Sequence, residues 1–330
     1  MTVVRAIEVR RFGPPDVLEP ADLPDPTPGP GQVLVAASAC DVLFVDTMIR
    51  SGAAAGYFPI QPPYVPGNGV GGKVVEIGAS ASPEWLGRPV AAHTGGPGGT
   101  GGYAQLAVAD LEHVVVVPDD VDLLAATAVL HDGTTALRVL EICGIQPGEW
   151  ILVLGAAGGM GILLVQLLAA RGAQVIGAVR GPAKREAVAR AGALATIDYG
   201  LPDWDASVLD ATGGVRPAVV LDGVGGAIGA AAFGLVADGG RFSAHGSPSG
   251  SFASIDTDAA LGRRVRVSTI GDLQYGAGDR SRLMKEILGL LAERRIAPLI
   301  GQTFALADAA KAHEAIEARG TVAKTLLLTG

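Results

Sequence analysis

The sequence has few cysteines and few aromatic residues, and it has no long apolar segment. Its two cysteines, Cys40 and Cys143, are too few for a disulfide framework or for a four-thiolate zinc site. No uninterrupted apolar run approaches the roughly 18 residues that a transmembrane helix requires. The start of the chain lacks the charged and apolar regions of a secretory signal. These absences predict a cytoplasmic protein that has no membrane partner.

Basic charge is also scarce. The chain has 25 Lys and Arg residues against 33 Asp and Glu residues, and its net charge is −8. A nucleic-acid partner would require a basic face, so we expect none. Glycine and proline are abundant, with 48 and 21 residues. This composition argues against a helical bundle and favours a fold with many tight turns.

Residues 1–120 contain short strand-like segments between glycine and proline loops. The proline-dense stretch Pro20–Pro30 cannot be helical. Little helix separates the strands, which predicts an antiparallel barrel or sandwich. The predicted strands are Val3–Arg11, Gln32–Ser38, Val74–Ile77, Arg88–Ala92 and His113–Val117.

The pattern changes after Pro118. A helix is predicted over Leu123–Ile142, and from Glu149 onwards strands alternate with helices. This alternation predicts an α/β fold with a parallel, doubly wound Rossmann sheet. The predicted strands are Trp150–Leu154, Gln174–Ala178, Ala195–Ile197, Ala218–Leu221, Arg241–Ala244, Val265–Thr269 and Thr321–Leu328. The predicted helices are Gly161–Arg171, Ala183–Ala191, Ala227–Val236 and Arg280–Arg294.

A glycine-rich turn joins the first of these strands to its helix. Its glycines lie at positions 155, 158 and 161, and Gly159 and Met160 complete it. One glycine permits a tight turn, one lets the backbone approach a diphosphate, and one lets helix and strand pack closely. The diphosphate would bind the N–H groups at the start of the helix. A glycine loop without function is the alternative, but the strand before the turn and the helix after it favour a dinucleotide site.

The end of the next strand distinguishes the two nicotinamide cofactors. An NAD site usually has an acidic residue there, which binds the ribose 2′-hydroxyl. This chain instead has Arg180, Lys184 and Arg185. Arg180 and Lys184 would attract a 2′-phosphate, although they could also be solvated charges at the start of a surface helix. The residues favour NADPH.

Metal and hydrolase chemistry are not indicated. The five histidines, at positions 93, 113, 131, 245 and 313, include no pair at helical ligand spacing, so no metal site is predicted. Gly246–Gly250 resembles the serine-hydrolase motif in its letters, but it contains a proline and does not join a strand to a helix. Two other segments follow strands, where doubly wound folds bind ligands: Asp222–Gly226 and Gly246-Ser247. Both could equally be ordinary turns.

Hydride transfer needs no side-chain nucleophile, because the nicotinamide carries the chemistry. The protein must supply a pocket and a donor for the negative charge that develops on the substrate. Tyr57, in the loop after Arg50-Ser51-Gly52, is a candidate donor, and a structural role for it is equally compatible with the sequence.

Several motifs, in this order, resemble the zinc-independent medium-chain dehydrogenase/reductases of the quinone oxidoreductase, or zeta-crystallin-like, family. The resemblance covers essentially the whole chain. The segments that carry it are Phe12–Leu18, Pro28–Val35, Asp46–Gly52, Pro66-Gly67, Gly102–Ala104, Asp132–Ala136, Ala156–Gly161 and Asp198-Tyr199.

The resemblance implies a GroES-like catalytic domain over residues 1–122 and 273–330, a Rossmann domain over residues 123–272, and a homodimer. It implies that Tyr57 matches the active-site tyrosine of enoyl-thioester reductases of this type. Among the candidate cofactor residues, Lys184 and Tyr199 match positions that bind the 2′-phosphate. The full set of candidates is Thr135, Gly158, Gly159, Met160, Gly161, Arg180, Lys184, Tyr199, Val224, Gly246, Ser247 and Arg319.

Two positions depart from the family pattern. Leu43 stands where the family commonly has an asparagine near the nicotinamide, and Gly69 stands where an acidic residue is usual. The sequence therefore predicts an NADPH-dependent reductase of quinones or enones. Two alternatives remain at this point: an enoyl-thioester reductase, and a cofactor-binding sensor or structural protein with little turnover.

Overall fold

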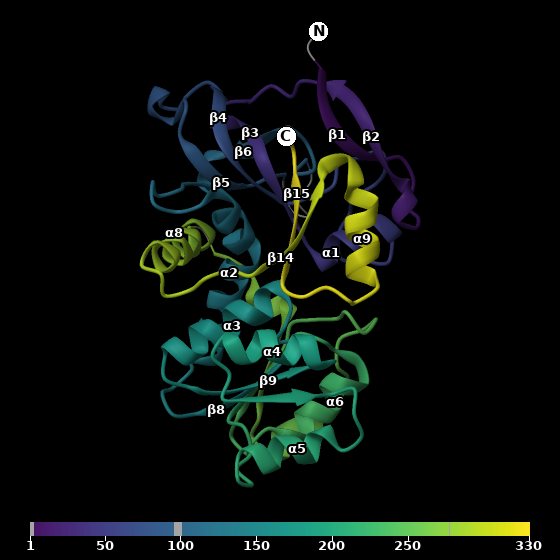
Figure 1. Cartoon of the computed structure of the whole chain (residues 1–330), viewed down its shortest axis with the longest axis vertical. Helices are drawn as coiled ribbons and strands as arrows, with labels where there is room; N and C mark the ends of the chain where they lie inside the picture. The colour runs from purple at the N-terminus through teal and green to yellow at the C-terminus, as the bar shows by residue number, and fades with distance from the viewer. Residues whose placement is uncertain (1–2, 96–100, 277) are drawn as a thin grey trace. The chain divides into compact units, whose positions relative to one another are not determined.

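The computed structural model describes residues 3–95, 101–276 and 278–330. It forms two compact units (Figure 1). The first unit consists of Met1–Thr134 with Ala277–Gly330, and the second is the continuous segment Thr135–Gly276. Helix α2 (Leu123–Cys143) contributes to both units, because the division falls within it. The domain boundary predicted between residues 122 and 123 lies at the start of this helix, whereas the division between the two units follows Thr134.

The first unit is built on a seven-stranded sheet with the order β14-β15-β3-β4-β5-β7, in which β6 pairs with β3. Its strand pairs are antiparallel except for β14 with β15, and β1 and β2 form a separate antiparallel pair. The strands are β1 (Val3–Val9), β2 (Leu18–Pro24), β3 (Gln32–Val42), β4 (Gly69–Ile77), β5 (Pro89–His93), β6 (Leu106–Asp110), β7 (Val114–Val116), β14 (Ile300–Ala305) and β15 (Lys324–Leu328). Besides part of α2, the helices are α1 (Phe44–Ser51), α8 (Asp279–Ala292) and α9 (Ala309–Glu317).

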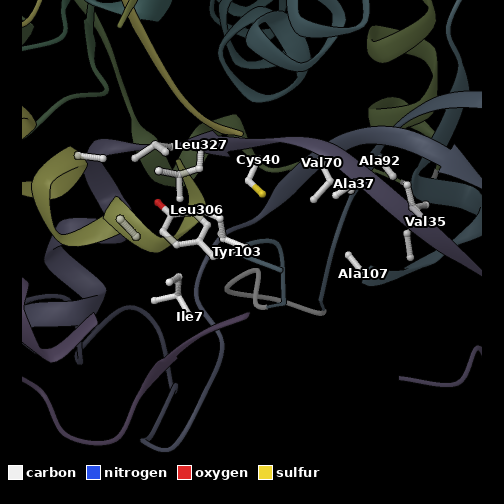
Figure 2. Close-up of a cluster of buried hydrophobic side chains, with 14 of the residues drawn as sticks. Ile7, Val35, Ala37, Cys40, Val70, Ala92, Tyr103, Ala107, Leu306 and Leu327 are labelled. Carbon is white, nitrogen blue, oxygen red and sulfur yellow. The ribbon is translucent and has the colours of Figure 1, made fainter. Parts of the chain in front are cut away.

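A buried apolar cluster joins the strands and α9 of the first unit. Figure 2 shows Ile7, Tyr103 and Leu306 grouped in it, with Cys40 nearby on β3. Cys40 is fully buried, and burial raises the pKa of its thiol to about 12. The thiol is therefore protonated and unreactive at neutral pH, as expected for a small core residue.

The second unit is a parallel sheet with the strand order β10-β9-β8-β11-β12-β13. Helices α3 and α4 cover one face, and α5 and α6 cover the other (Figure 1). The strands are β8 (Trp150–Leu154), β9 (Gln174–Val179), β10 (Ala195–Asp198), β11 (Val219–Asp222), β12 (Arg241–Ala244) and β13 (Arg266–Thr269). The helices are α3 (Gly159–Ala170), α4 (Pro182–Arg190), α5 (Trp204–Ala211), α6 (Gly226–Leu235) and α7 (Thr257–Gly262). This arrangement confirms the predicted Rossmann fold.

The order of these strands locates the ligand side of the sheet. From β8 the chain proceeds outward through β9 and β10, then returns to the other side of β8 and continues through β11 and β12. The order reverses between β8 and β11, and doubly wound sheets bind ligands beyond the carboxyl ends of the strands at such a point. Among the described residues, no helix has both the length and the apolar character needed to cross a membrane.

Candidate functional site

The glycine-rich turn lies at the carboxyl end of β8. Gly155 has a φ of +70°, and its N–H donates to the carbonyl of Ala178 at 3.0 Å. Helix α3 begins at Gly159, so the N–H groups of Gly159, Met160 and Gly161 belong to its first turn. These groups have no acceptor within the helix and lie at the positive end of its dipole. The arrangement fits a diphosphate.

Gly161 shows why this turn excludes side chains. A Cβ atom there would lie 2.4 Å from the carbonyl oxygen of Gly155 and 2.7 Å from the carbonyl carbon of Ala156. Both are backbone atoms, which cannot move aside without opening the turn. A Cβ atom at Gly158, in contrast, would meet only the Gly155 oxygen, at 3.4 Å.

We expect Gly161→Ala to raise the Kd for NADPH at least about tenfold and to lower the thermal unfolding temperature, because the turn must shift to accommodate the methyl group. Gly158→Ala is the matched control, and we expect it to keep nearly all of the stability of the parent protein. Differential scanning fluorimetry with and without NADPH measures both effects. Equal stability of the two variants would contradict the packing argument.

The predicted 2′-phosphate residues gather where β9 and β10 end. The Arg180 guanidinium lies over the Tyr199 ring, 5.5 Å from its centroid. Arg180 is exposed, and Lys184 lies in the first turn of α4. The nearby Asp198 carboxylate accepts hydrogen bonds from the N–H groups of Gly181 at 2.9 Å and Gly200 at 2.8 Å. Asp198 therefore joins the two strand ends, and Arg180 and Tyr199 are in contact beside it.

The ends of β11 and β12 bring further predicted residues to the same edge. The Val224 N–H donates to Asp222 Oδ1 at 2.9 Å, and the Gly246 N–H donates to the Asp222 carbonyl at 3.0 Å. Ser247 follows Gly246 in this loop. A Cβ atom at Gly155 would lie 3.3 Å from Val224 Cγ2, so the ends of β8 and β11 are in contact. Thr135 also belongs to the second unit, and its hydroxyl lies 3.3 Å from the Tyr275 hydroxyl.

Tyr57 and Arg319 belong to the first unit. Tyr57 follows α1 and is 72% exposed. Arg319 lies just after α9, is exposed, and has a φ of +58°. The structure thus gathers the other candidate residues within the second unit and assigns these two to the first.

The two departures from the family pattern also lie in the first unit. The N–H of Leu43 donates to Asp46 Oδ2 at 2.9 Å, which caps the start of α1. A Cβ atom at Gly69 would lie 2.7 Å from Leu130 Cδ2, so any side chain at this position on β4 would require Leu130 on α2 to shift.

Sequence reasoning missed a buried polar group in the first unit. His93, which is 3% exposed, hydrogen-bonds through Nδ1 to Asn68 Oδ1 at 2.9 Å, and its ring lies 5.8 Å from that of His131. Burial lowers the pKa of His131 to about 4 and that of His93 well below its usual value, so both rings are neutral at pH 7. The sequence offers these histidines only as possible metal ligands, because a contact between residues far apart in the chain leaves no local signal. Among the described residues, no group of three or more His, Cys, Asp or Glu side chains could hold a metal ion.

A second missed feature is the ion pair of Lys324 with Asp41 and Asp132. The Lys324 ammonium contacts the Asp41 carboxylate and lies 3.0 Å from Asp132 Oδ2. Lys324 is 3% exposed and Asp41 is 0% exposed. Burial favours the neutral amine, but the charges of Asp132 and Asp41 outweigh it and raise the pKa of Lys324. The lysine is therefore charged inside the protein.

Comparison with known proteins agrees with this arrangement. Residues 29–119 match the alcohol dehydrogenase GroES-like domain, and residues 159–289 match the zinc-binding dehydrogenase domain. The chain is 32% identical to a quinone oxidoreductase of Pseudomonas aeruginosa, over 99% of this chain and 100% of that protein. The chain belongs to the quinone oxidoreductase family. This confirms the family and the GroES-like and Rossmann folds that the sequence predicted.

Two further relatives inform the function. The crystal structure of Escherichia coli quinone oxidoreductase complexed with NADPH superposes with a TM-score of 0.91 at 26% identity, covering 98% of this chain and 100% of that one. A 2-haloacrylate reductase of Burkholderia is 29% identical over 99% of each chain.

Proposed function

We propose that this member of the family is an NADPH-dependent, zinc-independent reductase of quinones or of activated carbon–carbon double bonds. The observation that carries the proposal is that two groups able to bind phosphates follow strands of the parallel sheet: the start of α3 after β8, and Arg180 with Lys184 and Tyr199 after β9 and β10. The NADPH complex of the Escherichia coli relative supports the cofactor, and the 2-haloacrylate reductase supports reduction of double bonds.

The residues of this chain would bind the cofactor by its two phosphate-bearing parts. The N–H groups of Gly159, Met160 and Gly161 would bind the diphosphate, and Arg180 and Lys184 would bind the 2′-phosphate. Bound NADPH supplies a hydride from the nicotinamide C4 to the quinone or to the β-carbon of an enone. A proton must also reach the substrate, and we propose the Tyr57 hydroxyl or a water molecule as its source.

The proposal is tested by following NADPH oxidation with 1,4-naphthoquinone, a cyclic enone and an acyl-thioester as substrates. We expect turnover with the quinone or the enone, and we expect a metal chelator to leave it unchanged. Turnover with the thioester alone would favour an enoyl-thioester reductase. Tight NADPH binding without turnover on any of the three would favour a sensor or structural protein.

Replacement of Tyr57 by phenylalanine tests the proton source. If the hydroxyl donates the proton, we expect kcat to fall about tenfold or more on the best substrate, while the Kd for NADPH stays the same. The 72% exposure of Tyr57 makes structural damage by this change small. An unchanged kcat would assign the proton to water.

We further propose that the protein is cytoplasmic, as its composition predicts, and that it forms a homodimer, as the family resemblance implies. Light scattering coupled to size-exclusion chromatography measures the mass in solution. A mass equal to that of one chain at micromolar concentration would contradict the dimer.

A further inference from the structure

His245 is a histidine that the family motifs did not assign to the site. It directly follows β12, and its ring is half-buried. Its backbone N–H donates to the carbonyl of Asp222 at 3.1 Å, and the N–H of Gly246 donates to the same carbonyl at 3.0 Å. The loop that carries His245 is thus held to the end of β11.

The ring of His245 is oriented by Ser243. Its Nδ1 lies 3.1 Å from Ser243 Oγ, and Ser243 is 0% exposed. Among the described residues, Ser243 Oγ has no other hydrogen-bonding partner, and a buried hydroxyl proton needs an acceptor. Nδ1 can serve as that acceptor, and in this tautomer the ring carries its single proton on Nε2. Burial lowers the pKa of His245 to about 4, against a hydrogen bond with the Ser243 backbone that raises it, so the ring is neutral at pH 7.

The protonated Nε2 lies where β8 and β11 end. A Cβ atom on Gly223 would lie 3.5 Å from Nε2 and 2.9 Å from the carbonyl oxygen of Leu154. Gly223 follows β11 and Leu154 is the last residue of β8, so this hydrogen-bond donor is beside the point at which the strand order reverses. Gly223 itself contributes no side chain there.

We infer that His245 binds the cofactor by donating a hydrogen bond from Nε2 to an oxygen of its nicotinamide-side phosphate or of its nicotinamide nucleoside. The inference rests on the proposed function, since it requires NADPH in the second unit. It assigns His245 to the nicotinamide half of the cofactor. Arg180 and Tyr199 follow β9 and β10, on the other side of β8, and would bind the adenosine half.

Two substitutions separate the hydrogen bond from the shape of the side chain. His245→Phe keeps a ring but removes the donor, whereas His245→Gln keeps an N–H at nearly the reach of Nε2. We expect His245→Phe to weaken NADPH binding about threefold to tenfold, as for the loss of one neutral hydrogen bond, and His245→Gln to recover most of that loss. Isothermal titration calorimetry measures each Kd, and thermal unfolding without ligand checks the fold.

Cofactor fragments locate the acceptor. Adenosine 2′,5′-bisphosphate contains only the adenosine half, so we expect its Kd to be the same for the parent protein and His245→Phe. A weaker Kd for 2′-phospho-ADP-ribose would assign the contact to the diphosphate or the ribose, and an unchanged one would assign it to the nicotinamide. Equal weakening of NADPH and adenosine 2′,5′-bisphosphate, or no weakening of NADPH, would overturn the inference. Failure of the parent protein to bind NADPH would instead overturn the proposed function.

Discussion

Replacement of Arg180 by alanine is expected to weaken NADPH binding about tenfold to a hundredfold and to leave NADH binding nearly unchanged. The two cofactors differ only by the 2′-phosphate, and one charge-assisted contact is worth about 1.5–3 kcal/mol. Arg180 lies over the Tyr199 ring at the end of β9, and both oxygens of the nearby Asp198 carboxylate accept hydrogen bonds from backbone N–H groups. Lys184→Ala is expected to act in the same direction.

Arg190→Ala provides the matched control for this experiment. Arg190 is on the same helix, α4, but its side chain is 73% exposed and pairs with Glu186 at 3.2 Å. Removing it changes the net charge by the same amount without touching the proposed site. Titration of each variant with NADPH and NADH, followed by cofactor fluorescence, gives the ratio of the two Kd values. If Arg180→Ala weakened both cofactors equally, the assignment of the 2′-phosphate to this arginine would be wrong.

Replacement of Lys324 by methionine is expected to destabilise the protein by about 3–5 kcal/mol, because it leaves two carboxylates in the interior without their cation. The Asp41 side chain is 0% exposed and that of Asp132 is 14% exposed. For a unit of this size, the loss corresponds to a fall of roughly 10 °C in the unfolding temperature. Scanning calorimetry or fluorimetry measures the shift.

A double variant and a surface control test the cause. Adding Asp41→Asn to Lys324→Met removes the fully buried charge, so we expect it to recover part of the lost stability. Lys311→Met breaks a surface pair with Asp308 at 2.8 Å, in which the lysine is 67% exposed, and we expect almost no change in the unfolding temperature because solvent screens this pair. An unfolding temperature of Lys324→Met equal to that of Lys311→Met would show that the buried lysine contributes no net stability.

The Rossmann unit could be predicted from the sequence because its signals are local. Each parallel strand is a short apolar run in the sequence. The spacing of the glycines in the turn indicates where the backbone must turn tightly or pack closely. The observed strands Trp150–Leu154 and Arg241–Ala244 coincide with the predicted ones. The cations after β9 were likewise visible, since they lie within a few residues of the strand end.

The elements that were missed depend on distant partners. Strand β2 contains Pro20 and Pro24, which argue against a central strand. Within the described part of the chain β2 pairs only with β1, and an edge strand tolerates the missing N–H groups. Helix α1 was missed because Leu43, its N-cap, is an unfavourable capping residue, and Asp46 instead accepts the hydrogen bond of the Leu43 N–H. The buried lysine and the orientation of His245 likewise depend on side chains brought together by the fold.

The interrupted first unit has a consequence for synthesis on the ribosome. The second unit is one continuous segment, so all of its strands have been made before α8 leaves the ribosome. The sheet of the first unit, in contrast, is incomplete until β15 arrives, because β15 lies between β14 and β3. We therefore expect the nascent chain to form the fold of the second unit first, with the sheet of the first unit completed only when β15 has been translated.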